Sequence, residues 1–247
     1  MNESEIFNAI ISLKEGEEKF IEYKYKRERE ILWRDIETNE YPDVKITNGY
    51  ACFYYATKKI DILNESHYIP YSFLTKNSKI FNEIDNYLIN IKKQNKELIL
   101  KNKPQIKFDR FFIDLMIDLY NKKQINNTKY DYICYVPPTE SGDLVKNLVL
   151  EFGKCINIPV LCDFIFLNKK IKPQKYIFGK QARIKNVKNC YSLLKDINIK
   201  NKNILLIDDF EVDGSVILEI ANLLTLNGVN MITPMVLGRG VWIREEK

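Results

Sequence analysis

Several kinds of site are disfavoured by what this chain lacks. It has a single histidine, His67, so it offers no histidine cluster for a metal ion and no histidine paired by a motif with serine or cysteine, and we interpret His67 as a structural or surface residue. The five cysteines, at positions 52, 134, 155, 162 and 190, form no C-x-x-C pair, which indicates neither a disulfide framework nor a zinc knuckle. No apolar run approaches the roughly 20 residues of a membrane-spanning helix, so we expect no membrane span.

The composition is that of a globular protein. The 247 residues are 45% hydrophobic and 29% charged, enough for one large domain or two small ones. The net charge of +5 is a mild bias toward anionic partners. The first residues, MNESEIFNAIISLKEGEEKF, have no basic segment ahead of their apolar stretch, so we expect a cytoplasmic protein without a signal peptide. Nothing in the pattern indicates an oligomeric state.

The first part of the chain, residues 1–105, is rich in tyrosine, lysine and asparagine. IEYKYK (21–26) and the run 46–62, with its Asn48-Gly49 turn signal, have strand-like patterns. A helix is predicted over 78–100, because apolar residues recur on one face at Ile80, Ile84, Tyr87, Leu88 and Ile91. We predict a smaller α+β region over 1–105, acting as a hood or an interaction module, with a boundary in the basic, proline-containing segment near residue 105.

From residue 106 to 247 the pattern alternates between helix and strand. Apolar spacing predicts helices around 108–119, 145–152 and 217–224, and apolar runs predict strands at 130–136, 159–167, 204–207 and 231–237. Continuously apolar strands separated by helices are typical of a parallel sheet with helices on both faces, an α/β fold. Ligands of such sheets bind at the carboxyl ends of the strands.

The strongest candidate site is the stretch ILLIDDFEVDGSV, residues 204–216. Asp208 and Asp209 follow an apolar strand, and Gly214 precedes the next helix, where backbone N–H groups and the helix dipole favour a phosphate. A Walker-B strand would need a partner G-x-x-x-x-G-K-[ST], which the sequence lacks. A receiver domain would need most of a domain after its acidic pair, and only residues 210–247 follow. The structural alternative is that the acidic pair caps a helix or satisfies a loop.

This stretch resembles the phosphoribosyl-diphosphate loop of type I phosphoribosyltransferases, in which four apolar residues precede D-D-x-x-T-T-G-x-T. The upstream segment QKYIFGKQARIKNVKNCY is similar to the Q…R-x-x-N-V-x-x-A-F segment of the ComF-like branch, with matching residues at Gln174, Arg183, Asn186, Val187 and Tyr191. The strand YDYICYVPP corresponds to a strand that ends in proline in that family. The resemblance covers about residues 108 to 240.

The resemblance implies a phosphoribosyltransferase-type domain over 106–247 that binds a ribose-phosphate or nucleotide-type ligand. The implied reaction transfers a (phospho)ribosyl group to a nitrogen acceptor with release of pyrophosphate. Asp208 and Asp209 would hold the ribose hydroxyls and lie in the outer sphere of Mg²⁺, with phosphoribosyl diphosphate as co-substrate. The loop after them would bind the 5′-phosphate, and the turn TESGD (139–143) would face the pyrophosphate. The implied ligand-binding residues are Thr139, Glu140, Ser141, Gly142, Gln174, Asn186, Glu211, Val212, Asp213, Gly214 and Ser215.

The basic stretch 169–188 has eight Lys or Arg residues and no Asp or Glu, and it permits three interpretations. It could be a mobile cationic cover over a leaving pyrophosphate, with Arg183 as the catalytic candidate. It could be a solvated surface loop. It could also contact nucleic acid, because Tyr176 and Phe178 are interleaved with its positive charges.

The resemblance breaks inside the candidate loop itself. Val212 and Asp213 replace the two threonines before the glycine, and Val216 replaces the threonine after it. An ionised Asp213 within about 4 Å of a phosphate would be repelled by roughly 4 kcal/mol per unit charge at an effective dielectric constant near 20. The loop would still work if Asp213 pointed outward, if a lysine neutralised it, or if the ligand offered a hydroxyl in place of the phosphate. The alternative functions are a non-catalytic ligand-sensing or nucleic-acid-associated protein on the same fold, and a structural partner in an assembly.

Overall fold

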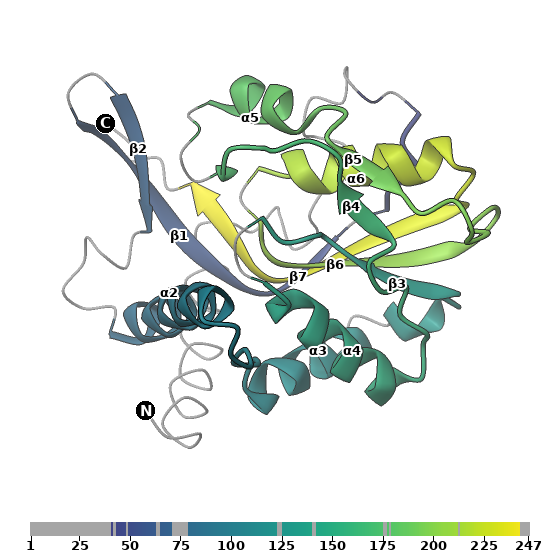
Figure 1. The fold of residues 1–247 in the computed structure, drawn as a ribbon, viewed down its shortest axis with the longest axis horizontal. Coiled ribbons are helices and arrows are strands. Elements are labelled where there is room, and N and C mark those ends of the chain that lie inside the picture. Colours follow the sequence, from purple (N-terminus) through teal and green to yellow (C-terminus); the bar gives the residue numbers. More distant parts are fainter. Residues whose placement is uncertain are drawn as a thin grey trace.

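The computed structural model describes residues 41, 43–47, 49–62, 65–70, 79–122, 125–139, 142–174, 177, 179–211 and 213–242. Its main sheet has the strand order β2-β1-β7-β6-β3 (Figure 1). The strands are β1 (Tyr50–Ile62), β2 (Glu65–Pro70), β3 (Tyr132–Tyr135), β6 (Asn203–Glu211) and β7 (Met231–Trp242). The neighbours β1, β7, β6 and β3 are parallel, and β2 pairs antiparallel with β1.

Alternate residues of the central strand β6 supply two separate cores. Leu205 and Ile207 are fully buried in a cluster with α3 (Arg110–Lys122), α4 (Leu144–Ile156) and Ile91 of α2 (Lys79–Leu100). Ile204 and Leu206 are fully buried in a second cluster with α6 (Ser215–Leu226) and the inner side of α5 (Lys180–Val187). Because successive strand residues point to opposite faces, helices cover both faces of the sheet (Figure 1). The predicted α/β fold with a parallel sheet between helices is confirmed.

The remaining elements are short. A 3₁₀ turn, η4 (Ile125–Asn127), follows α3, and a separate two-stranded sheet pairs β4 (Ile165–Leu167) antiparallel with β5 (Tyr191–Leu193). The predicted helices near 78–100, 108–119, 145–152 and 217–224 correspond to α2, α3, α4 and α6. Among the residues described, no helix is both long enough and apolar enough to cross a membrane.

Two local predictions were wrong. The run 159–167 is not one strand of the main sheet, because only Val160 bridges to Ile133 before Asp163, at φ 53°, turns the chain into β4. The second half of the basic stretch is not a loop but the helix α5. Its lysines hid the period in the sequence, but Ile184 and Val187 are buried on its inner side. The predicted strand IEYKYK (21–26) lies outside the described residues.

The strand β1 connects the two halves of the chain. It lies within the predicted N-terminal region 1–105, yet it pairs in parallel with β7 from Tyr50, opposite Met235, to Thr57, opposite Trp242. An isolated bridge between Ile46 and Ile232 extends this contact. The division at residue 105 stays a prediction, and β1 is an element of the first region that enters the sheet of the second.

Candidate functional site

The acidic stretch lies at the carboxyl end of β6, next to the start of α6 on one face and α2 on the other. Asp208, Asp209 and Glu211 are the last residues of the strand, and Gly214 precedes α6 with the left-handed φ of 77° that favours glycine. Since β3 and β6 are parallel, the turn after β3 lies at this same edge of the sheet. This is the edge where ligands of parallel sheets bind.

Asp209 contacts a cation that the sequence pattern did not indicate. Its Oδ2 lies 2.5 Å from Nζ of Lys92 on α2, and its Oδ1 accepts the N–H of Phe210 at 2.7 Å. Lys92 Nζ also lies 5.3 Å from the centre of the Phe210 ring, within cation–π range. Lys92 is in the N-terminal region, which was predicted to be a hood or an interaction module, and no motif marks it among the other lysines of α2.

Asp208 lies in a different electrostatic setting. Its Oδ1 accepts the N–H of Asp209 at 2.8 Å. Burial away from water raises the pKa of Asp208 well above its usual value, and the charges of Asp209 and Glu211 add to this, while the charge of Lys92 opposes it. The adjacent aspartates therefore differ: Asp209 is ion-paired, and the neutral form of Asp208 is favoured.

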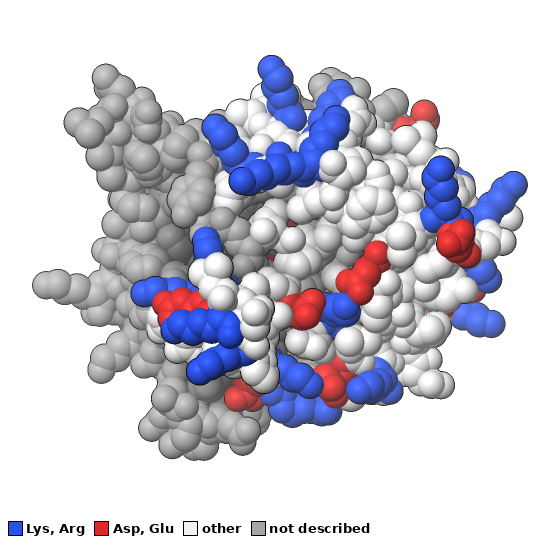
Figure 2. Space-filling model, in the orientation of Figure 1, with Lys and Arg blue, Asp and Glu red and all other residues white. Residues whose placement is uncertain are grey.

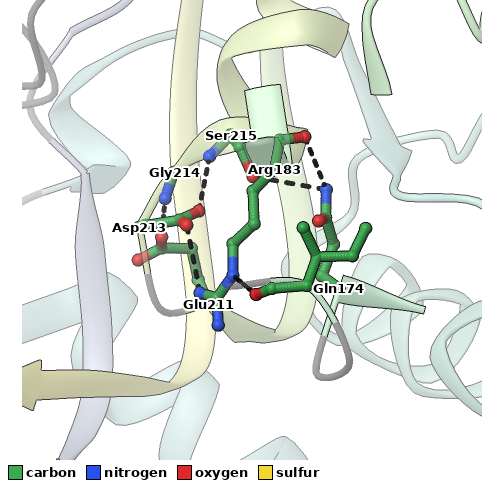
Figure 3. A network of polar contacts seen from close by, with 7 residues as sticks. Gln174, Arg183, Glu211, Asp213, Gly214 and Ser215 are labelled. Atoms are coloured by element: carbon green, nitrogen blue, oxygen red, sulfur yellow. Dashed lines mark hydrogen bonds and ion pairs between the residues drawn. The ribbon is translucent and has the colours of Figure 1, made fainter. Parts of the chain in front are cut away.

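The loop after β6 is closed by its own carboxylates (Figure 3). The N–H of Gly214 donates to Oε1 of Glu211, and the N–H of Ser215 donates to Oδ1 of Asp213 at 3.1 Å. Oδ2 of Asp213 lies 3.0 Å from Nη1 of Arg183 on α5. Asp213 thus does not point outward, and the residue that neutralises it is Arg183 rather than a lysine.

Arg183 is an internal residue of the fold. Its side chain is only 6% exposed, and its Nε donates to the carbonyl of Ile177 at 2.8 Å. Gln174 supports this arrangement, because its Nε2 donates to the carbonyl of Arg183 at 3.3 Å and to Oγ of Ser215 at 3.4 Å. Its Oε1 is buried without a hydrogen-bond partner. With its side chain bound to Ile177 and Asp213 and its carbonyl bound to Gln174, Arg183 does not have the freedom of a mobile cover.

The other implied ligand residues are distributed differently. Asn186 is not in the corner, since its side chain exchanges hydrogen bonds with the backbone of Lys172. Thr139 and Gly142 lie in the turn between β3 and α4. Glu140, Ser141 and Val212 lie outside the described residues. The sequence thus identified Arg183 and Gly214 as residues of one corner. It did not predict that Arg183 and the N–H of Gly214 bind carboxylates of the same loop.

The turn before α4 is also covered from within the chain. Oε1 of Gln105 accepts the N–H of Asp143 at 2.8 Å. Gly142 has a φ of 61°, and a Cβ atom there would lie 2.1 Å from Gln105 Oε1 and 2.5 Å from Ile99 Cδ1. The segment after α2 therefore packs on the turn that the resemblance assigned to pyrophosphate.

The charges around the loop disfavour a second anion. Asp213 pairs with Arg183, so a carboxylate of the loop already lies against this cation. An incoming phosphate would have to compete with that carboxylate for Arg183. The phosphate would also have to displace the carboxylate oxygens from the N–H groups of Gly214 and Ser215.

The acidic pair fits a divalent cation poorly in this arrangement. Lys92 lies against the Asp209 oxygen that would face a cation, and the neutral form of Asp208 is a weaker ligand than a carboxylate. In the described part of the chain, no group of three or more His, Cys, Asp or Glu residues is arranged to hold a metal ion. The implied Mg²⁺ site therefore stays a prediction of the resemblance.

No protein-family model matches the chain, and a comparison with curated proteins finds no match. Similar solved structures include a hypoxanthine phosphoribosyltransferase from Staphylococcus aureus, with 17% sequence identity and a TM-score of 0.35 over 52% of this chain and 62% of that one. Another is a purine phosphoribosyltransferase from Pyrococcus horikoshii, with 14% identity and a TM-score of 0.36 over 57% of this chain and 94% of that one. The chain thus spans less than two thirds of the first of these proteins. TM-scores of this size do not define a family.

Proposed function

We propose that the chain is a phosphoribosyltransferase-like protein that binds a ribosyl compound at the carboxyl end of β6. The observation that carries this proposal is the adjacent pair Asp208 and Asp209 at a ligand-binding edge, beside the Gly214 turn into α6. A carboxylate has about four acceptor positions, so Asp209 can accept ribose hydroxyls beyond its contacts with Lys92 and Phe210. Asp208 in its neutral form can both donate to and accept from a hydroxyl.

Binding is better supported than phosphoribosyl transfer. Transfer from phosphoribosyl diphosphate would use the N–H groups of the β6–α6 loop for the 5′-phosphate and a free cation for the leaving pyrophosphate. Here those N–H groups donate to Glu211 and Asp213, and Arg183 is ion-paired inside the fold. These contacts favour the ligand-sensing alternative, and transfer to a nitrogen acceptor with Mg²⁺ is the less supported form of the proposal.

The test is a thermal-shift series with millimolar ribose, adenosine, ribose 5-phosphate and phosphoribosyl diphosphate, each with and without Mg²⁺. At least one ribosyl compound should raise the melting temperature, and the double variant Asp208→Asn with Asp209→Asn should abolish the shift. The matched control is Asp131→Asn, which removes an aspartate paired with Lys202 at the opposite end of β6. An unchanged melting temperature with every compound would rule the proposal out.

A second candidate is nucleic-acid binding by the basic stretch, and a specific observation favours it. Lysine side chains gather on the surface over α5 (Figure 2), and the described residues Lys169, Lys170, Lys172, Lys185 and Lys188 are all exposed. Arg183, from the same stretch, points inward. The exposed lysines therefore form a cationic surface separate from the acidic corner, suited to a phosphate backbone.

A further inference from the structure

We infer that Asp213 determines the specificity of the β6–α6 loop and closes it to phosphate, so that the corner takes a ribosyl compound with a free 5′-hydroxyl. The ligand class rests on the proposed ribosyl site, whereas the exclusion of phosphate rests on the loop alone. A nucleoside is then preferred over the corresponding nucleotide. The corner contains the turn and the cation of an anion site, but Glu211 and Asp213 already bind the turn, and Asp213 binds the cation.

The backbone donors at the start of α6 are already used within the loop. A phosphate at the start of α6 would be held by the backbone N–H groups of that turn. The N–H of Gly214 donates to Glu211 and that of Ser215 donates to Asp213, so both have charged acceptors already. An incoming phosphate gains from these donors only if it displaces two carboxylates that are covalently held in place. A hydroxyl group has no such requirement, because it can donate to a carboxylate oxygen.

The cation nearest this turn, Arg183, is also bound by Asp213. An Asx-turn would require only one oxygen of Asp213, the one that accepts the N–H of Ser215. The other oxygen pairs with a guanidinium that is 6% exposed and fixed by the carbonyl of Ile177, while Asp213 itself is 15% exposed. This pair consumes the positive charge that would otherwise face an anion. The carboxylate of Asp213 thus binds both the N–H of Ser215 and the guanidinium of Arg183, the two groups that a phosphate at this turn would use.

The two turns at this edge differ in charge, which supports a specific role for Asp213. In the turn before α4, the N–H of Asp143 is satisfied by Gln105, whose amide is neutral. In the turn before α6, both acceptors are acidic and one of them has an arginine partner. A neutral acceptor would satisfy the backbone equally well. Acidic acceptors, unlike neutral ones, also repel an incoming anion.

The experiment is a gain of binding by the variant Asp213→Asn. Asparagine keeps the acceptor for the N–H of Ser215 but removes the carboxylate charge that pairs with Arg183 beside the turn. Titration calorimetry with inorganic phosphate should detect no binding to the wild-type protein at millimolar concentration. The variant should bind phosphate with a dissociation constant at least about tenfold below the lower limit that this sets for the wild type. Asp131→Asn, which also loses an ion pair and keeps an acceptor for a backbone N–H, should gain nothing.

Two further variants and a comparison of two ligands test the same inference without relying on Asp213→Asn alone. Asp213→Ser, with a short acceptor suited to such turns, should show the same gain, and adding Arg183→Met to Asp213→Asn should remove it. In the wild-type protein, adenosine should bind more tightly than adenosine 5′-monophosphate. Phosphate binding by the wild type, a preference for the monophosphate, or folded Asp213 variants without any gain would each overturn the inference. A phosphate gain without any ribosyl binding would instead refute the proposed function and leave the closed loop intact.

Discussion

Asp208 and Asp209 are neighbours in sequence but contribute to stability with opposite signs. Asp209 has a cationic partner in Lys92, whose side chain is 35% exposed, so the ion pair contributes at most about 1 kcal/mol. The pKa of Asp208 is raised, first by burial and then by the charge of Asp209. In the folded protein Asp208 therefore holds its proton at pH values where the unfolded chain has already released it.

This difference predicts that Asp208→Asn stabilises the protein at neutral pH. As pH rises above the usual aspartate pKa of about 3.9, the unfolded chain binds fewer protons than the folded one, so the free energy of unfolding falls until the raised pKa of Asp208 is passed. The asparagine variant has no carboxyl proton at this position, so it should not lose stability in this way. Melting temperatures of the variant and wild type should diverge between pH 4 and pH 7.5.

The control for this prediction is the adjacent residue. Asp209→Asn removes the ion pair with Lys92 and should lower the melting temperature at pH 7.5 instead of raising it. If Asp208→Asn melted below the wild type at pH 7.5, or if the difference did not grow with pH, the description of Asp208 as a partly buried, proton-holding carboxyl would be wrong.

Helices and strands with a clear apolar period could be predicted from the sequence, and those whose period is masked by charge could not. The runs around Leu205 and Ile220 belong to β6 and α6 as expected. The helix α5 was missed because charged side chains surround its two buried apolar positions, Ile184 and Val187. Within the site, the resemblance assigned Arg183 and Asp213 to the same ligand site. Their ion pair, and the partner Lys92, depend on how α5 and α2 pack, which local spacing does not encode.

The exposed side of α5 carries the prediction for nucleic acid. Replacing Lys185 and Lys188 with glutamate should weaken binding of a single-stranded 20-nucleotide RNA by at least about tenfold at low salt, because each lysine that meets a phosphate releases a counterion. The plot of log affinity against log salt should also become shallower by about one unit for each lysine that contacts a phosphate. Fluorescence anisotropy measures both quantities.

Glutamate at the exposed positions Lys101 and Lys103, after the end of α2, gives the same charge change away from α5 and should have little effect. The double variant of Asp208 and Asp209 should also bind RNA like the wild type. Absence of binding by the wild type at 50 mM salt would leave the lysines of α5 as a solvated surface.

The two halves of the molecule depend on each other through the sheet and through the segment after α2. The strand β1 covers the edge of β7, and Asn95, which is fully buried, exchanges hydrogen bonds of 2.8 and 2.7 Å with the backbone of Ile106. Lys92 contacts Asp209 near the end of β6, and Gln105 contacts the turn before α4. The region 1–105 thus supplies parts of the site as well as part of the sheet.

Removing residues 1–105 should therefore leave a fragment, 106–247, that is poorly folded. The fragment exposes the hydrogen-bonding edge of β7, which favours edge-to-edge aggregation, and loses the apolar cover that Ile91 of α2 gives to one core. We expect it to aggregate or to melt roughly 10 °C or more below the full chain, consistent with a loss of several kcal/mol. Size-exclusion chromatography and circular dichroism melting measure both properties. A monomeric 106–247 fragment with the full chain's melting temperature would show instead that the boundary near residue 105 separates independent domains, since a fold that needed β1 could not survive its removal.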